Sequence, residues 1–300
     1  MEYIRTNEFN IEYPTVVTFG KFDGLHKGHK LLVDEAKSIA GKENLKVVLC
    51  TFDMTEWLSS KTPQISLATE RYKICERLGV DMLLEYPFDK AMADMEPEEF
   101  VREFIFGKLN ARYVIVGTDW RFGKNRSGDV EVLKALQEKY GYQAVVMEKY
   151  KDDGIEISST RIREEITKGN MEKVSELLGY PYTISGTVLS GNRLGRTIGF
   201  PTINFEPEDS KILPPYGAYA SRVVVDGKEY KAVTNVGVKP TVEGNKKLTV
   251  ETHILDFNKD CYDEFLEVSL VHFMRPEMKF ESFEVLKKQL ETDVENSLTY

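Results

Sequence analysis

The chain has 300 residues, a formal net charge of −9, four histidines and three cysteines. This length exceeds the range of about 100–200 residues that is usual for one domain, so two domains are expected. The acidic balance argues against a nucleic-acid coat or a membrane-surface protein, and no apolar run approaches the roughly 20 residues of a membrane-spanning helix. The cysteines are odd in number and widely spaced, which fits neither a disulfide framework nor a zinc cluster and favours a cytoplasmic protein; they are Cys50, Cys75 and Cys261.

The first part of the chain alternates short apolar segments with longer helical ones. Strands are expected over 16–20, 46–52, 82–85, 113–117 and 142–148, and helices over 28–40, 69–78, 97–109 and 130–140. Continuously apolar, β-branched strands separated by helices predict an α/β domain whose parallel sheet is covered on both faces. Ligands of such sheets bind beyond the carboxyl ends of the strands.

Two further helical stretches, over 160–168 and 171–178, precede the sequence Gly179-Tyr180-Pro181, after which the pattern changes. Strands are expected over 183–189, 219–225, 229–235, 248–257 and 267–274, followed by a helix over 282–293. Short strands separated by turn residues predict a small antiparallel β-barrel with one terminal helix. The expected domains are therefore residues 1–182 and 183–300.

Half of the histidines fall within the segment 20–29, which reads GKFDGLHKGH and lies between the first strand and the first helix. Gly24 and Gly28 permit tight turns and a close backbone approach to a phosphate. His26 and His29 are three residues apart, so both rings can project from one side of the first helical turn. A glycine loop with two histidines at the start of a helix suits the stabilisation of charge on a phosphoryl or nucleotidyl group during its transfer. A glycine turn with two solvated histidines is the competing interpretation.

The segment resembles the H-x-G-H signature of the nucleotidyltransferase superfamily, and the whole chain resembles the bacterial bifunctional riboflavin kinase/FAD synthetase family. The resemblance implies a Rossmann-like nucleotidyltransferase domain followed by a flavokinase-like barrel. It implies that His26 and His29 stabilise the α-phosphorus and the departing pyrophosphate. The phosphate-binding loop would include Gly20, Phe22, Gly24 and Gly28.

Two more segments of the first domain carry the resemblance. Residues 157–163, ISSTRIR, match an S-S-T-x-I-R element that contacts ATP phosphates, and the implied contacts are Ser159, Thr160, Arg161 and Arg163. Residues 117–123, GTDWRFG, resemble a G-x-D-F-x-F-G loop, which implies flavin contacts by Asp119, Trp120 and Phe122. Residues 51–57, TFDMTEW, depart from the family's T-F-x-P-H-P loop on the flavin side, which puts that part of the pocket in doubt.

The second domain contains a glycine-rich stretch, residues 186–204, that ends in the sequence PTIN. Such glycine density suits a flap that wraps around phosphates, in which Gly191 and Arg196 are the expected phosphate contacts. The alternative is that the glycines only form turns of the barrel. The ending matches the P-T-x-N signature of flavokinases, and the oxygens of Thr202 and Asn204 suit Mg²⁺. Glu251 resembles the family's catalytic base, with a solvent-facing strand residue as the alternative. Arg275 is expected to contact flavin or nucleotide or, equally, to form a plain salt bridge.

The resemblance implies two ATP-dependent reactions. The second domain would phosphorylate riboflavin to FMN, and the first would adenylylate FMN to FAD with release of pyrophosphate, using Mg²⁺ and ATP. Three alternatives stay open: an enzyme with one working half, a nucleotidyltransferase for another phosphate substrate, and a flavin-binding regulator. We expect a cytoplasmic monomer or weak homo-oligomer with small-molecule substrates and no nucleic-acid or membrane partner.

Overall fold

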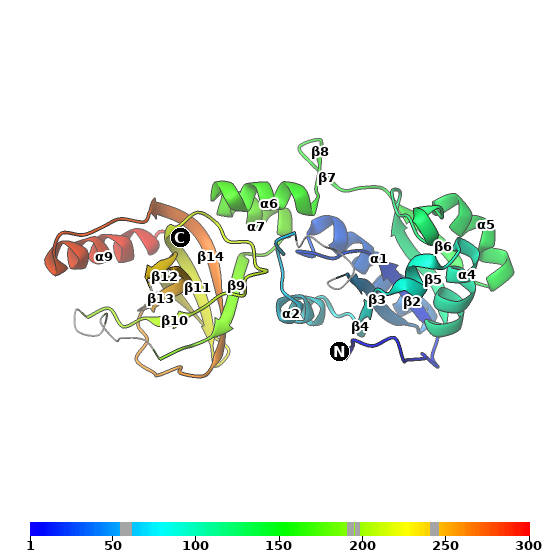
Figure 1. Ribbon diagram of the computed structural model, residues 1–300, viewed down its shortest axis with the longest axis horizontal. Helices are drawn as coiled ribbons and strands as arrows, with labels where there is room; N and C mark the ends of the chain where they lie inside the picture. Colours follow the sequence, from blue (N-terminus) through cyan, green and yellow to red (C-terminus); the bar gives the residue numbers. More distant parts are fainter. Residues whose placement is uncertain (55–61, 191–194, 196–198, 241–245) are drawn as a thin grey trace. The chain divides into compact units, whose positions relative to one another are not determined.

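A computed structural model describes residues 1–54, 62–190, 195, 199–240 and 246–300 (Figure 1). It divides into two compact units: one comprises Met1–Thr62 and Ala68–Ser158, and the other comprises Pro63–Leu67 and Ser159–Tyr300. The two compact units meet at Ser158/Ser159, upstream of the expected domain boundary at residue 182, which stays a prediction. The reason is that helix α6 (Ser159–Lys168) packs on helix α7 (Met171–Leu178), which lies against strands of the second sheet.

The first unit is built on a six-stranded sheet in which every pair of neighbours is parallel. The strand order is β1 (Glu2–Ile4), β4 (Met82–Pro87), β3 (Lys46–Asp53), β2 (Thr15–Phe19), β5 (Ala111–Gly117) and β6 (Gln143–Met147). The predicted strands are confirmed, because β-branched apolar runs suit a sheet that is buried on both faces. Strand β1 was not predicted, since its three residues carry no apolar pattern.

The helices of the first unit follow the strands in turn. They are α1 (Lys27–Glu43), α2 (Ala68–Leu78), α3 (Lys90–Asp94), α4 (Pro97–Glu99), the π-helix η1 (Phe100–Lys108), the 3₁₀ turn η2 (Lys124–Arg126) and α5 (Val130–Tyr140). The helix expected over 97–109 exists, but most of it is a π-helix. Its buried Phe100 and Phe104 rings lie 5.2 Å apart within an aromatic core that includes Phe19 and Tyr86. A short hairpin, β7 (Lys151–Asp152) and β8 (Ile155–Glu156), follows the sheet.

The second unit contains a six-stranded antiparallel sheet. The order is β10 (Ile203–Phe205), β13 (Lys246–Ile254), β12 (Lys228–Pro240), β11 (Gly217–Val225), β14 (Phe265–Pro276) and β9 (Tyr182–Thr187). The sheet curls into a half-barrel that brings its edge strands β9 and β10 close together. Gly186 on β9 lies so near Phe205 on β10 that a Cβ atom on the glycine would be 2.4 Å from the Phe205 ring. Helix α9 (Phe283–Ser297) packs against β11, β12 and β14. The expected antiparallel barrel-like domain with a terminal helix is confirmed.

No helix in the described part of the chain is both long enough and apolar enough to cross a membrane.

Candidate active sites

The segment that joins β2 to α1 shapes the first candidate site. Phe22, Gly24 and Leu25 have positive φ angles of 46°, 86° and 37°, so the loop turns sharply before the helix begins at Lys27. His26 is the N-cap of α1, and its Nδ1 accepts a hydrogen bond of 3.3 Å from the backbone N–H of His29. A Cβ atom on Gly28 would lie 3.2 Å from the His26 ring, so a glycine lets the ring fold back over the helix end.

The two histidine rings are stacked, with centroids 3.7 Å apart and planes inclined by 15°. Burial lowers the pKa of His26 to about 4. Burial, together with the nearby His26, lowers the pKa of His29 well below its usual value. Both side chains are therefore neutral at pH 7. Since His26 Nδ1 accepts a hydrogen bond, its proton is on Nε2, which can donate to a ligand.

His29 also has an unsatisfied polar atom. Its Nδ1 is buried and has no hydrogen-bond partner within the described residues. The ring is fixed from the other side by Phe22, whose centroid lies 5.1 Å away in an edge-on contact. An unpartnered buried nitrogen beside a helix N-terminus leaves one polar position for a ligand at the carboxyl edge of the sheet.

The loop after β5 lies at the same edge of the sheet, because β2 and β5 are parallel neighbours. The Trp120 ring stacks on Phe122 at 4.5 Å and on Phe19 at 5.3 Å. Phe122 is buried in the core, so its ring supports Trp120 instead of facing solvent. Asp119 is exposed and forms an ion pair of 2.8 Å with Lys149. Sequence reasoning missed Lys149, which comes two residues after β6 with no motif around it.

The predicted ATP-contacting residues Ser159, Thr160, Arg161 and Arg163 lie on the first two turns of α6. They belong to the second unit, whereas His26 and His29 belong to the first. Arg163 Nε donates a hydrogen bond of 2.8 Å to the carbonyl of Pro63, a residue of the same unit. One function of Arg163 is therefore to hold the short segment Pro63–Leu67 on the second unit.

The loop 51–57, whose sequence differs from the family's T-F-x-P-H-P loop, lies only partly within the described residues. Thr51 is buried in β3, and its hydroxyl donates to the carbonyl of Lys21 at 3.2 Å. Phe52 joins the aromatic core through Tyr86 and Phe88. Residues 55–57 lie outside the described part of the chain, as do Gly191 and Arg196 of the glycine-rich stretch.

The second candidate site is a row of residues across five neighbouring strands of the half-barrel. Asn204 on β10 is paired with Glu251 on β13, and Glu251 is paired with Asn235 on β12. Asn235 is paired with Ala218 on β11, and Ala218 with Arg275 on β14. Residues that are directly paired point to the same face of a sheet. The register therefore gathers an amide, a carboxylate, a second amide and a guanidinium, with the small Ala218 leaving space between them.

This row forms one wall of a cavity of about 380 Å³. The opposite wall is apolar and comes largely from one face of α9 and the segment before it: Met278, Phe280, Phe283, Leu286, Leu290 and Val294. These residues were not predicted as site residues, although the spacing of Phe283, Leu286, Leu290 and Val294 indicates an amphipathic helix. An apolar wall facing a few polar groups is typical of a site for a small organic ligand.

The predicted metal ligands lie together at one end of the cavity. Asn204 Nδ2 lies 3.3 Å from Thr202 Oγ1, and Asn204 Oδ1 is buried without a hydrogen-bond partner among the described residues. An unsatisfied amide oxygen beside a hydroxyl is a donor set that fits Mg²⁺. Thr202 also lines a second cavity of about 320 Å³, whose wall includes Thr252 and Tyr262. His253 holds this region in place, since its Nδ1 lies 2.7 Å from the Pro201 carbonyl oxygen.

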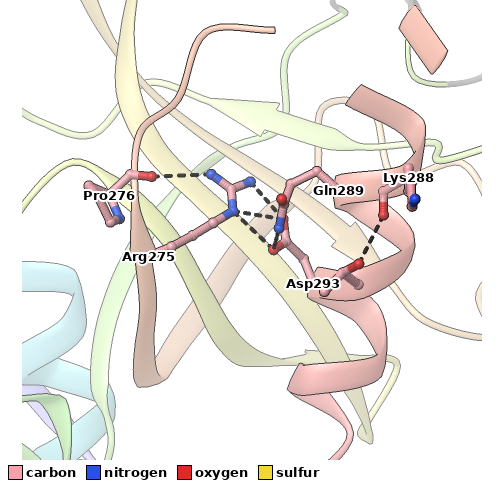
Figure 2. Close-up of polar contacts among 6 residues, drawn as sticks. Arg275, Pro276, Lys288, Gln289 and Asp293 are labelled. Atoms are coloured by element: carbon pink, nitrogen blue, oxygen red, sulfur yellow. Dashed lines mark hydrogen bonds and ion pairs between the residues drawn. The ribbon is translucent and has the colours of Figure 1, made fainter. Parts of the chain in front are cut away.

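Arg275 forms a salt bridge, one of the two roles expected from the sequence. Its Nε lies 3.0 and 3.2 Å from the two carboxylate oxygens of Asp293, and its Nη2 lies 2.6 Å from Oδ2 (Figure 2). Asp293 lies on α9, is 1% exposed and also accepts a 2.9 Å hydrogen bond from Gln289. Arg275 and Asp293 both line the larger cavity. Nothing in the sequence around Asp293 indicated this partner.

Comparisons with known proteins also divide the chain into two parts. Residues 9–161 match the family model described as FAD synthetase, and residues 178–300 match the one described as riboflavin kinase. The chain is 33% identical to a bifunctional riboflavin kinase/FMN adenylyltransferase of Listeria monocytogenes, with 99% of this chain and 95% of the relative covered. It is 34% identical to the protein of the same description from Escherichia coli (strain K12), with 93% and 90% covered.

Among solved structures, one from Streptococcus pneumoniae, described as a macrolide-efflux protein, has a TM-score of 0.88 at 32% identity and covers all of both chains. It supports the fold of both units. With two family models that together span most of the sequence and relatives that align over nearly its full length, the chain belongs to the bifunctional riboflavin kinase/FMN adenylyltransferase family.

Proposed function

We propose that this protein makes FMN from riboflavin in its second unit and FAD from FMN in its first, with ATP as the second substrate of both reactions. The observation that carries the proposal is the cross-strand row, which brings Asn204 and Glu251 together in a cavity with an apolar wall. Family membership supports the same pair of activities.

In the kinase reaction, the flavin ring would lie against the apolar face of α9 with its ribityl chain directed toward Glu251. The Glu251 carboxylate takes the proton of the riboflavin 5′-hydroxyl. The hydroxyl oxygen then bonds to the γ-phosphorus of ATP, the bond from that phosphorus to the β–γ bridging oxygen breaks, and ADP leaves. The products are FMN and ADP, and the proton passes from Glu251 to solvent.

Thr202 and Asn204 would hold Mg²⁺ with the ATP phosphates, and the bound ion would neutralise part of their charge. The unpartnered Oδ1 of Asn204 supports this assignment. Thr202 contributes to both cavities, so it is suitably placed between the phosphate acceptor in the larger cavity and ATP in the smaller one. Gly191 and Arg196 remain proposed contacts of the ATP phosphates.

In the adenylylation reaction, a phosphate oxygen of FMN bonds to the α-phosphorus of ATP, the bond to the α–β bridging oxygen breaks, and pyrophosphate leaves. Neutral His26 and His29 would donate N–H groups to the phosphate oxygens where negative charge develops. Donors that are fixed by stacking and capping need little reorganisation during the reaction. The predicted ATP contacts on α6 and the predicted flavin contacts Asp119 and Trp120 complete this proposal, with Phe122 supporting the Trp120 ring.

A reducing compartment such as the cytoplasm suits the protein. Cys50, Cys75 and Cys261 are all buried as free thiols. Burial raises the pKa of Cys75 to about 12 and that of Cys261 to about 11, so these thiols are unreactive at neutral pH.

One assay tests the proposal. The purified protein is incubated with riboflavin, ATP and Mg²⁺, and the flavins are separated by chromatography. The bifunctional enzyme forms both FMN and FAD. An enzyme with only the kinase half working forms FMN alone, and one with only the adenylylating half working forms FAD only when FMN is supplied in place of riboflavin. A flavin-binding regulator forms neither product. Absence of both products from a folded protein would refute the proposal.

The variant His29→Ala then assigns the adenylylation site. It should abolish FAD formation while FMN accumulates at the wild-type rate, because the kinase site lies in the other unit. If His29→Ala also removed FMN formation in a folded protein, the assignment of two separate sites would be wrong.

A further inference from the structure

His253 lines the larger cavity of the second unit, but the proposed kinase mechanism does not use it. It follows Glu251 by two residues on β13, so both side chains point to the same face of the sheet. Its Nδ1 lies 2.7 Å from the Pro201 carbonyl oxygen, and its ring meets the Phe200 ring edge-on with centroids 5.2 Å apart. His253 therefore contacts the two residues that come directly before the proposed Mg²⁺ ligand Thr202.

This contact is made where the backbone pairing of β10 stops. Strand β10 pairs with β13 from Ile203 to Phe205, and Ile203 is opposite Thr252. Continued pairing would place Thr202 opposite His253. Proline has no N–H group to donate to a neighbouring strand, so Pro201 marks the end of the ladder. The His253 side chain supplies a hydrogen bond to the segment at the point where the ladder ends.

The contact reaches the proposed metal ligands through a short series of bonds. A carbonyl oxygen only accepts, so Nδ1 of His253 carries the proton and donates it to Pro201. The Pro201 carbonyl shares a planar peptide group with the nitrogen of Thr202, so fixing the carbonyl restricts Thr202 as well. Asn204 Nδ2 then donates to the Thr202 carbonyl and hydroxyl, both at 3.3 Å. This leaves Asn204 Oδ1 buried and without a partner among the described residues.

The two proposed ligands differ in how the fold holds them. Asn204 lies within the ladder opposite Glu251, and its carbonyl also accepts a 2.7 Å hydrogen bond from the Leu189 N–H. Thr202 precedes the ladder and depends on the contact of His253 with Pro201. Pro201 itself is exposed, so water can replace the histidine at its carbonyl and the fold does not require this bond. The consequence of the bond is the orientation of Thr202.

We propose that His253 is a positioning residue for the metal site of the kinase: by donating to the Pro201 carbonyl, it keeps the Thr202 hydroxyl beside Asn204 so that both oxygens bind one Mg²⁺ ion. This inference rests on the proposed kinase function. His253 acts through Pro201 and not on a reacting atom, so its effect is on the affinity for Mg²⁺ with nucleotide.

The test compares His253→Leu with His253→Asn in the full-length protein. Leucine and asparagine are similar in size and branching, but only asparagine has a nitrogen bonded to Cγ, as Nδ1 is, that can still donate to the carbonyl. The Mg²⁺ concentration for half-maximal FMN formation should rise about fivefold in His253→Leu, as expected for the loss of one hydrogen bond. It should stay within about twofold of the wild type in His253→Asn, and the KM for riboflavin should stay within about twofold in both.

The matched control is His272→Leu. His272 is also a hydrogen-bonded histidine of this sheet, with Glu172 as its partner, and it lines neither of the two cavities described above. The control should leave the Mg²⁺ requirement unchanged.

A binding measurement tests the metal site without turnover. Calorimetry gives the affinity for ADP in saturating Mg²⁺ and in EDTA, and the ratio of the two affinities reports how strongly Mg²⁺ supports nucleotide binding. Asn204→Ala removes a proposed ligand, so it defines the part of this ratio that belongs to the kinase site. His253→Leu should lower that part about fivefold and leave the affinity in EDTA unchanged, whereas His253→Asn should preserve both.

Three results would overturn the proposal: an unchanged Mg²⁺ requirement in His253→Leu, an equal rise in His253→Asn, or an equal rise in His272→Leu. If the wild type forms no FMN, the kinase proposal itself has failed. If the wild type forms FMN and His253→Leu binds ADP with the wild-type dependence on Mg²⁺, only the role of His253 has failed.

Discussion

Acidification should destabilise the first unit through His26, and the magnitude follows from its burial. The pKa of His26 falls from its ordinary value of 6.5 to about 4 in the folded protein because the ring is desolvated. Between these two values the unfolded chain binds more protons than the folded one, so the free energy of unfolding decreases as the pH falls. From a pH of about 7.5 to about 5, this linkage amounts to about 2 kcal/mol. His29, whose pKa is also lowered by burial, adds an effect of the same sign.

The variant His26→Asn isolates the contribution of His26, because asparagine is also a good helix N-cap and can still accept from the His29 N–H. Both tryptophans, Trp57 and Trp120, lie in the sequence of the first unit, so urea unfolding followed by tryptophan fluorescence reports on that unit. We expect the wild type to lose about 2 kcal/mol more stability than the variant between the two pH values. If wild type and variant lose equal stability, His26 is not a buried neutral histidine and the reasoning about its protonation is refuted.

Three further predictions concern the second unit. Glu251→Gln should abolish FMN formation from riboflavin while supplied FMN is still converted to FAD; retained kinase activity would show that Glu251 is not the base. Asn204→Ala should raise the Mg²⁺ concentration needed for half-maximal kinase activity, as measured by titration at saturating ATP, and an unchanged requirement would contradict its role as a ligand. Gly186→Ala should lower the stability of this unit by about 1–3 kcal/mol by overpacking, since the new Cβ atom would lie 2.4 Å from the Phe205 ring. Calorimetry measures the resulting fall in the unfolding temperature, and an unchanged unfolding temperature would mean that the two edge strands are not in contact.

The local sequence predicts much of this fold because its elements are specified by nearby residues. The strand at 46–52 and the helix at 130–140 are found within a residue or two of their expected ends. The caps are local as well: Asp129 accepts from the backbone of Glu131 and Val132, and Ser282 accepts from Val285. The three-residue strands β1 and β10 were missed, since each is too short to show a pattern and takes its structure from pairing with a distant strand.

The chemistry of the histidine loop is likewise largely local. The glycines, the cap and the pair His26 and His29 lie within ten consecutive residues, so their proximity follows from a strand, a turn and a helix. Their neutral state could not be predicted, because it depends on burial by residues elsewhere in the unit.

By itself, the sequence determined the order of the elements, the two fold classes, and the residue types proposed to do the chemistry. Only the tertiary structure decided that Asn204, Glu251, Asn235 and Arg275 form one row, and that Asp293 of a distant helix fixes the last of them. The physical reason is strand register. A shift of one residue in any pair would turn a side chain to the opposite face of the sheet, and that register is set by the turns and packing of the whole half-barrel rather than by the residues themselves.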